Sequence, residues 1–270
     1  MPEKRDEAEG RYLYCVAGSR EELTLGEIGL GDAEVYTIPS GDLCAVVHEC
    51  SPEPYDSDDE EEVKRWVKSH QRVMDKVMED PRFSGIVPAG FDTIVQAKED
   101  RTARENVSLW LKKESNSLLK QLQEVKNREE YGVQIMYDPD WLEAKVSKKS
   151  EEFRSLREKI ESKPEGAAYL YEEKLKKLLK EKRGRVKERL LSKFYEMITP
   201  TVSRVKQEDN KDRLEEKKML LNLSCLVKRA EYEELGAALE DIEEREGVSV
   251  RFTGPWAPFS FTELKNAEGD

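Results

Sequence analysis

An α+β protein of two domains is the fold class that this 270-residue sequence predicts. Up to about residue 125, strand-like segments and amphipathic helical patterns are intermixed. Beyond that point, two long helical patterns stand between strand-like segments. The charged stretch 126–130 is the weakest point between the two parts. We therefore expect an N-terminal α+β domain at 1–128 and a C-terminal domain at 129–270.

The first strands of the N-terminal domain are predicted by runs of β-branched and aromatic residues. RYLYCVA (11–17) reads as a strand, and EVYTIPSGDLCAVVHEC (34–50) holds two strand-like runs around the turn signal at 39–41. The glycines in LGEIGLGD (25–32) match neither GxGxxG nor a P-loop, so they indicate turns rather than a phosphate site.

Two helices complete this domain. Apolar residues recur at intervals of three and four over 63–77, which predicts an amphipathic helix. The acidic run DSDDEEE (56–62) precedes this helix, where carboxylates suit the positive end of the helix dipole. SGIVPAGFDTIV (84–95) reads as extended chain, and a second helix is expected at about 100–125.

The C-terminal domain begins with the strand YGVQIMYD and continues into helical patterns at 142–160 and 171–198, separated by the turn SKPEG. Gly184 is expected to kink or break the second of these helices. A strand, a helix and the last strand VSVRF follow. This order resembles a modified ferredoxin-like fold with one helix enlarged into a long helical hairpin, a helical extension at about 139–205.

Composition restricts the class of protein. No apolar run approaches the ~18 residues of a membrane helix, and the first ten residues lack a signal-peptide segment. Four scattered cysteines fit a reducing compartment, so we expect a soluble intracellular protein. The net charge is −12, yet 145–193 holds 17 Lys/Arg against 9 Asp/Glu, a local +8 that leaves −20 elsewhere. This acidity argues against a generic nucleic-acid binder.

No catalytic, cofactor-binding or metal site is predicted. Cys44, His48 and Cys50 share one face of a strand, but Cys44 and His48 would lie ~13 Å apart, too far to share one zinc ion. His70 falls on the apolar stripe of its helix, where a partly buried histidine with satisfied hydrogen bonds is the simpler interpretation than a catalytic one.

The basic helical hairpin is the first candidate for binding a partner. Its lysines and glutamates are spaced for pairing within a solvated helix face, and that interpretation stays open. The excess of +8 favours a docking surface for an acidic partner. The candidate residues are Lys176, Lys177, Lys180, Lys182, Arg183 and Arg185.

Several segments resemble the GvpL/GvpF gas vesicle protein family over nearly the whole chain. RYLYCVAG is similar to the opening strand of that family, DLCAVVHEC to its second conserved strand, and FTGPWAPFSF is the most specific match. VPAGFDTIV resembles the family's Leu-Pro-x-Arg-Phe-Gly-Thr segment, with Pro88, Phe91 and Thr93 in place. Gly90 stands where that pattern has Arg, and Asp92 where it has Gly.

This resemblance implies a non-enzymatic role, a minor structural component and assembly factor of gas vesicles. The implied partners are the hydrophobic main shell protein and other gas vesicle accessory proteins, with no nucleic acid and no membrane. The implied location is the gas vesicle, with a cytoplasmic stage before assembly. An RNA-binding module on a ferredoxin-like sheet is the alternative, and it requires aromatic residues on the paired central strands. An enzyme with a site between the domains lacks any recognisable catalytic set.

The stretch GPWAPFSF near the chain end combines aromatic residues with prolines that exclude a helix or a central strand. We expect this tail to be stiff and packed in the junction between the domains, with Trp256 as a buried anchor. Direct insertion into the shell protein is the competing hypothesis. The tail residues concerned are Gly254, Pro255, Trp256, Pro258, Phe259 and Phe261.

Overall fold

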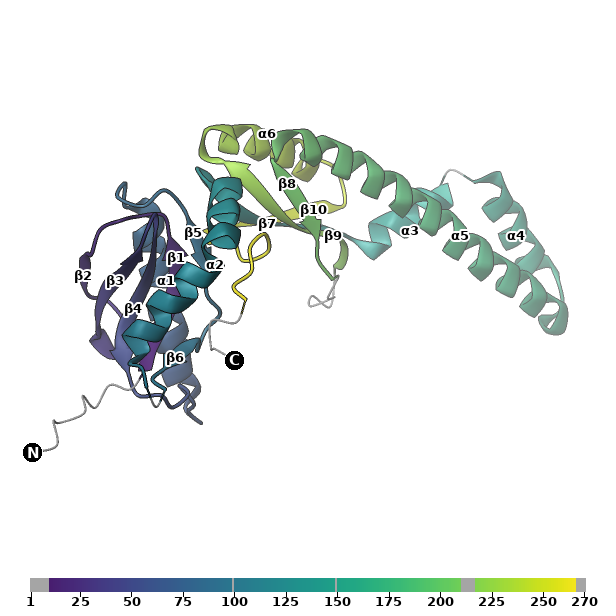
Figure 1. The fold of residues 1–270 in the computed structure, drawn as a ribbon. Helices are drawn as coiled ribbons and strands as arrows, with labels where there is room; N and C mark the ends of the chain where they lie inside the picture. Colours follow the sequence, from purple (N-terminus) through teal and green to yellow (C-terminus); the bar gives the residue numbers. More distant parts are fainter. Residues whose placement is uncertain (1–9, 99, 149, 210–216, 266–270) are drawn as a thin grey trace, which may run out of the picture. The chain divides into compact units, whose positions relative to one another are not determined.

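The computed structural model describes residues 10–98, 100–148, 150–209 and 217–265. Two antiparallel sheets with helices (Figure 1) confirm the predicted mixture of helices and strands. The chain divides into two compact units, one of Met1–Glu130 with Pro255–Asp270 and one of Tyr131–Gly254. The expectation that the chain has no signal peptide was based on its first ten residues. Nine of these, residues 1–9, lie outside the described part of the chain.

The first unit contains a six-stranded sheet with the order β2-β3-β4-β1-β5, and β6 also pairs with β1. Strand β1 therefore has neighbours along its whole length on both edges. A short 3₁₀ helix, η1 (Leu30–Asp32), follows β2. The strands are β1 (Gly10–Ala17), β2 (Thr24–Glu27), β3 (Glu34–Ser40), β4 (Leu43–Cys50), β5 (Ile86–Pro88) and β6 (Ile94–Gln96).

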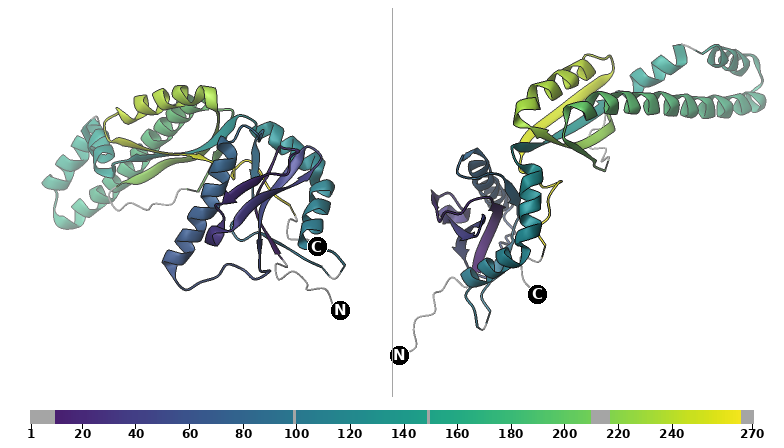
Figure 2. Two further views of the ribbon diagram at one scale, coloured as in Figure 1. Left: turned by 90° about the vertical axis from the view of Figure 1, so that its left-hand side faces the viewer. Right: turned by 45° about the horizontal axis from the view of Figure 1, so that its top comes forward.

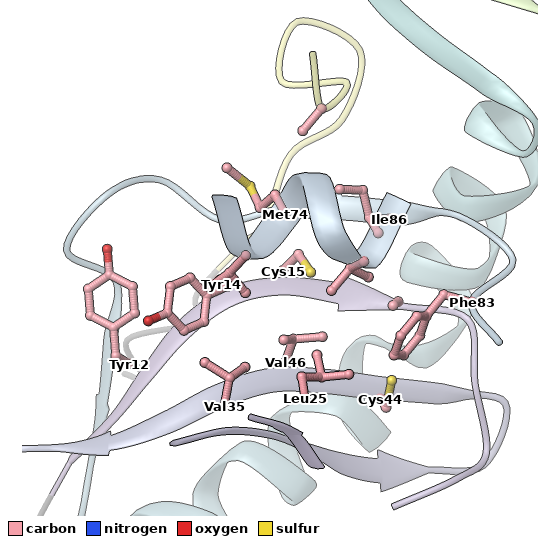
Figure 3. Packing of buried hydrophobic residues seen from close by; sticks show 14 of the residues in the cluster. Tyr12, Tyr14, Cys15, Leu25, Val35, Cys44, Val46, Met74, Phe83 and Ile86 are labelled. Carbon is pink, nitrogen blue, oxygen red and sulfur yellow. The ribbon is translucent and has the colours of Figure 1, made fainter. Parts of the chain in front are cut away.

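Two helices pack on opposite faces of this sheet. Helix α1 (Glu60–Glu79) begins after Asp59, whose side chain accepts a hydrogen bond from the Glu61 N–H. Its apolar stripe contacts one face of the sheet, where Figure 3 shows Met74 above Cys15. Helix α2 (Ala103–Val125) starts with a capping box between Thr102 and Glu105. Its stripe covers the other face and contributes Val107, Trp110, Leu111, Leu118 and Leu122.

A β-bulge changes the alternation of side chains along β1. Leu13 pairs with Val47 and Cys15 pairs with Val46, so Tyr14 is the additional residue on β1. Tyr14 and Cys15 consequently both belong to the cluster beneath α1. The bulge thereby adds one large aromatic side chain to the α1 face of the sheet.

The second unit has a four-stranded sheet of order β10-β7-β9-β8. Strand β8 was not predicted from the sequence, because Val205 is the only apolar residue in its four positions. The elements are β7 (Arg128–Tyr137), α3 (Pro139–Lys148), α4 (Glu151–Ser162), α5 (Glu165–Ile198), η2 (Thr199–Thr201), β8 (Arg204–Gln207), β9 (Lys218–Lys228), η3 (Arg229–Glu231), α6 (Tyr232–Glu243) and β10 (Val248–Trp256).

Helix α5 is unbroken through its 34 residues, so the expected kink or break at Gly184 is wrong. At 1.5 Å per residue it is ~51 Å long. Its C-terminal part buries Phe194 and Ile198 in the core of the second unit. Its N-terminal part lies beside α4 (Figure 2), and we call this helical pair, residues 151–187, the arm. The first expected helical pattern, 142–160, is two helices, α3 and α4.

The C-terminal tail differs from its expected position in two respects. Strand β10 continues to Trp256, and Pro255 is tolerated there because β10 is an edge strand. The residues from Pro255 onward cluster with the first unit, an exception to the expected domain at 129–270. Ala257, Pro258 and Phe261 are buried in the tail. Trp256 is 44% exposed, so its expected role as a buried anchor is wrong.

We expect Phe261→Ala to lower the free energy of unfolding by about 3–5 kcal/mol, the usual cost of truncating a buried phenylalanine. Phe261 is only 8% exposed, whereas the matched control Phe259 is 42% exposed. Phe259→Ala should therefore change stability by less than about 1 kcal/mol. Urea unfolding of both variants measures the difference, and equal losses would show that Phe261 does not fix the tail.

Candidate functional site

Two aromatic side chains are presented to solvent by the tail. Trp256 is 44% exposed and Phe259 is 42% exposed, while the residues between them, Ala257 and Pro258, are buried. Large aromatic residues dominate the energetics of protein interfaces. This pair, which we call the aromatic pair, is therefore a candidate contact surface.

The segment that carries the aromatic pair is fixed by hydrogen bonds within the first unit. Ser260 donates from its N–H to Glu130 Oε2 (2.8 Å) and from its hydroxyl to Glu130 Oε1 (2.6 Å). Glu263 exchanges two hydrogen bonds with the Gln121 side chain of α2, and Trp110 Nε1 donates to the Lys265 carbonyl. Because these contacts order the segment before any partner binds, binding it would cost little further conformational entropy.

The arm carries the second candidate surface. Between Lys174 and Lys187 there are eight Lys or Arg residues and one Glu. Of the predicted partner-binding residues, Lys176, Lys180 and Arg183 line one shallow groove on α5, together with Leu179, Gly184 and Lys187. The groove has a volume of about 440 Å³.

The other predicted basic residues lie elsewhere on the arm. Lys177 lines a second groove between α4 and α5, which also contains glutamates. Lys182 forms an ion pair with Glu152 of α4 (3.4 Å), and Arg185 forms one with Glu181 (2.6 Å). The six residues therefore do not form a single face. Such exposed pairs contribute little stability, consistent with the open interpretation of a solvated helix surface.

A buried network of tyrosines and histidines lies under α1, and no motif in the sequence indicated it. Tyr12 Oη lies 2.9 Å from His70 Nδ1, and Tyr14 Oη lies 2.9 Å from His48 Nδ1. The other nitrogen of His48 lies 3.0 Å from the hydroxyl of Tyr55. Both histidines are buried, which confirms the interpretation of His70 as a satisfied structural residue.

The proton positions in this network follow from its acceptors. The carbonyl of Ala89 can only accept, so His70 Nε2 carries the proton in its 3.3 Å contact with that oxygen. His70 Nδ1 must then accept from the Tyr12 hydroxyl, which itself accepts the N–H of Asp92. Burial lowers the pKa of His48 and of His70 to about 4. The same desolvation raises the pKa of the Tyr12 hydroxyl. All these groups are therefore neutral at pH 7.

Cys44 and Cys50 are buried and not in disulfides. Burial raises the pKa of the Cys44 thiol to about 12 and that of the Cys50 thiol to about 11, so neither is a thiolate at neutral pH. Both ring nitrogens of His48 contact tyrosine hydroxyls. Across residues 10–98, 100–148, 150–209 and 217–265, no three His, Cys, Asp or Glu side chains are grouped to hold a metal ion.

The family model for the gas vesicle synthesis protein GvpL/GvpF matches residues 10–263. The chain belongs to the GvpL/GvpF family. Gas vesicle protein L1 of Halobacterium salinarum is 30% identical over 267 residues, which cover 96% of this chain and 92% of that protein. Gas vesicle protein L of Haloferax mediterranei is 27% identical over 297 residues, covering 97% of this chain and 90% of that protein.

Solved structures show the same fold. The crystal structure of GvpF from Anabaena superposes with a TM-score of 0.76 at 21% identity, over 95% of this chain and 99% of that one. GvpF from Microcystis aeruginosa gives a TM-score of 0.67 at 17% identity, over 95% of this chain and all of that one. In the helices that the structure describes, no segment is both long and apolar enough to span a membrane.

The two departures from the GvpL/GvpF pattern have different structural consequences. Asp92, where the pattern has Gly, has a φ of 66°, a conformation that glycine adopts without strain and Asp tolerates. Its Oδ1 accepts a hydrogen bond from the Tyr55 N–H (2.9 Å), an interaction that glycine could not make. A Cβ at Gly90 would meet only Thr93 Oγ1, at 3.9 Å, so the fold leaves room for a side chain there.

Stability should fall as the pH is lowered from about 6.5 to about 4. The two histidines have folded-state pKa values of about 4, below their ordinary value of 6.5. The unfolded chain therefore binds more protons in this window, at up to about 1.4 kcal/mol per pH unit for each histidine. Urea unfolding at several pH values measures this slope. The double variant His48→Gln/His70→Gln should be less steep than the parent, and each single variant intermediate; identical slopes would contradict the assignment.

Asp92→Ala should lower the free energy of unfolding by about 1–2 kcal/mol, because alanine keeps the left-handed strain and loses the bond to Tyr55. Asp92→Gly loses the same bond but relieves the strain, so it should be the milder change. Denaturant unfolding compares the two variants directly. An alanine variant as stable as the glycine variant would show that backbone conformation does not govern this position.

Proposed function

We propose that this protein is a minor structural component and assembly factor of gas vesicles. In this role it binds the main shell protein in the cytoplasm and limits its aggregation while vesicles nucleate. Membership of the GvpL/GvpF family and relatives named gas vesicle proteins L1 and L support the association with gas vesicles. Other gas vesicle accessory proteins are further partners in this proposal.

The aromatic pair is the observation that carries the proposal. An apolar face on a shell subunit would drive aggregation, because its burial stabilises any contact by roughly 25 cal/mol per Å². Trp256 and Phe259 offer an apolar contact on a soluble, charged chain, and the segment that holds them is already fixed. The competing hypothesis for the tail, direct insertion into the shell protein, is thus favoured over the expected packing of Trp256 inside this chain.

The role proposed here is not enzymatic and requires no cofactor or metal. The buried Tyr–His network is the nearest approach to a catalytic arrangement in the described residues. Its histidines and tyrosines are neutral and bonded to one another or to the backbone. It stabilises the contact between α1 and the sheet.

The RNA-binding alternative has little support in the sheet of the second unit. Base stacking requires aromatic side chains on the face of the sheet away from the helices. On the central strands, the aromatic residues are Tyr131 and Tyr137 of β7, and both belong to the core that the helices share. The opposite face of these strands carries Gln134 and Asn222, which bond to each other, and Ser224.

The second unit fits the description of an enlarged ferredoxin-like fold. Its strands β7, β8, β9 and β10 are the first to fourth of the unit, and they lie in the order fourth, first, third, second. Helices α3 to α5 stand between the first two strands and α6 between the last two. This β-α-β-β-α-β arrangement supports the ferredoxin-like class, with the arm as the enlargement.

The double variant Trp256→Ala/Phe259→Ala should lose at least about tenfold in affinity for the main shell protein, as expected for interface aromatics. Its melting temperature should stay close to that of the parent, because both side chains are substantially exposed. Co-expression with the shell protein measures binding as the fraction of shell protein that stays soluble and co-purifies.

The matched control is Leu109→Ala/Leu119→Ala, which removes two exposed apolar side chains from α2. This control should keep the shell protein soluble. If the aromatic variant performs as well as the parent, the tail is not the contact surface. If both variants fail equally, the binding is unspecific hydrophobic adhesion.

A further inference from the structure

The groove on α5 is lined by positive charges that the shell-protein proposal does not use. Lys176 and Lys180 are exposed, and Arg183 and Lys187 continue the same helix face at intervals of three and four residues. At about 100° per residue, Leu179 and Gly184 lie on the two flanks of this stripe of cations. A stripe of four cations fits an acidic segment.

Gly184 lies on one flank of the groove. A glycine inside a helix costs about 1 kcal/mol relative to alanine, and no contact with the described residues requires a glycine here. A Cβ at Gly184 would meet no atom within 4 Å, and its φ is not in the left-handed range. The missing side chain does, however, let a second backbone approach α5 closely.

Charge on the groove is only partly neutralised inside the chain. Lys176 pairs with Glu173 (2.9 Å), and Arg183 pairs with Glu143 of α3 (2.5 Å). Lys187 lies over the ring of Tyr137, which attracts the cation but does not cancel its charge. For Lys180, no ion pair occurs within the described residues.

A complementary segment exists in the same sequence. Six of the seven residues of DSDDEEE, at 56–62, are acidic, and they lead into α1. Only Asp59 is used to cap the helix, and Lys64 pairs with Glu60 and Glu61. Asp56 and Asp58 are exposed and have no ion pair in the part of the chain described.

We propose that the groove on α5 binds the acidic segment 56–62 of a second copy of this chain. The charge distribution favours this occupant, because the basic region at 145–193 carries +8 while the rest of the chain carries −20. Each copy has one groove and one acidic segment, so the contact joins two different surfaces and can add further copies. The proposal is independent of the shell-protein proposal, since it is tested on the purified full-length chain alone.

Analytical ultracentrifugation of the full-length chain measures the association over a range of protein and salt concentrations. We expect a mass that rises with concentration at about 0.01 M salt and returns to a single chain near 1 M, as the Debye length falls from about 30 to 3 Å. A single chain at every concentration in low salt would overturn the proposal. Binding of an added acidic helical peptide to a chain that stays single would also overturn it, and would assign the groove to another protein.

Charge reversal identifies the two surfaces. Lys176→Glu/Lys180→Glu and Asp56→Lys/Asp58→Lys should each weaken self-association about tenfold or more, because each opposes like charges. An equimolar mixture of the two variants should associate to within about threefold of the parent, because each contact then joins opposite charges again. A control, Lys112→Glu/Lys113→Glu on α2, makes the same change in net charge at exposed positions and should associate nearly as the parent does. A mixture that stays dissociated, or a control as weak as the groove variant, would refute the pairing.

The Gly184→Ala variant tests whether a second chain approaches α5 closely, because it leaves the charge of the groove unchanged. It should raise the melting temperature, because alanine favours the helix, and weaken self-association several-fold, because its methyl group hinders the approach of a second backbone on that flank of the groove. Gly236→Ala in α6 is the matched control, since a Cβ there also meets nothing within 4 Å. It should raise the melting temperature and leave association unchanged. If Gly184→Ala associates as the parent does, the second chain does not approach α5 closely at this position.

Discussion

The central position of β1 is the constraint on which the first unit depends. This strand pairs with β4 along one edge and with β5 and β6 along the other, and helices cover both of its faces. Every side chain from Tyr12 to Ala17 is therefore buried. A strand in this position cannot tolerate an unsatisfied polar group. The hydroxyls of Tyr12 and Tyr14 find partners only because His48, His70 and the backbone of 30 and 92 converge on them.

The need to bury apolar faces explains which elements of the fold could be predicted from the sequence. Long periodic patterns such as 63–77 and 100–125 gave the helices correctly, because one face of each must be buried. The bulge at Tyr14 has no local signal, since the pairs on either side of it, Leu13 with Val47 and Cys15 with Val46, join residues more than 30 positions apart. Strand β8 is short and polar and exists only because β9 pairs with it. Gly184 was read as a helix breaker, but the neighbouring helix formers outweigh a cost of about 1 kcal/mol.

The residue types of the candidate surfaces could be predicted from the sequence, but the positions of their side chains could not. Counting charges located the basic arm, yet only three of its six expected residues line the α5 groove. Composition also singled out the tail, but an aromatic residue next to proline is read equally well as an anchor or as an exposed contact. Ala257, Pro258 and Phe261 turned out to be the buried residues. The segment that holds them is fixed by the bonds between Ser260 and Glu130, residues 130 positions apart. Contacts over such separations leave no pattern in a single sequence.

The return of the tail makes the second unit an insertion within the first. Ala257 belongs to the hydrophobic cluster of β1 and α1, and Leu264 packs against the cluster of α2. During synthesis, residues 1–130 must therefore wait for residues 255–264 before their core is closed. At about 5–20 residues per second, the intervening segment takes several seconds to tens of seconds to emerge. In that interval the nascent chain exposes apolar surface that the folded protein covers, so the first unit is completed only after the second unit has been synthesised.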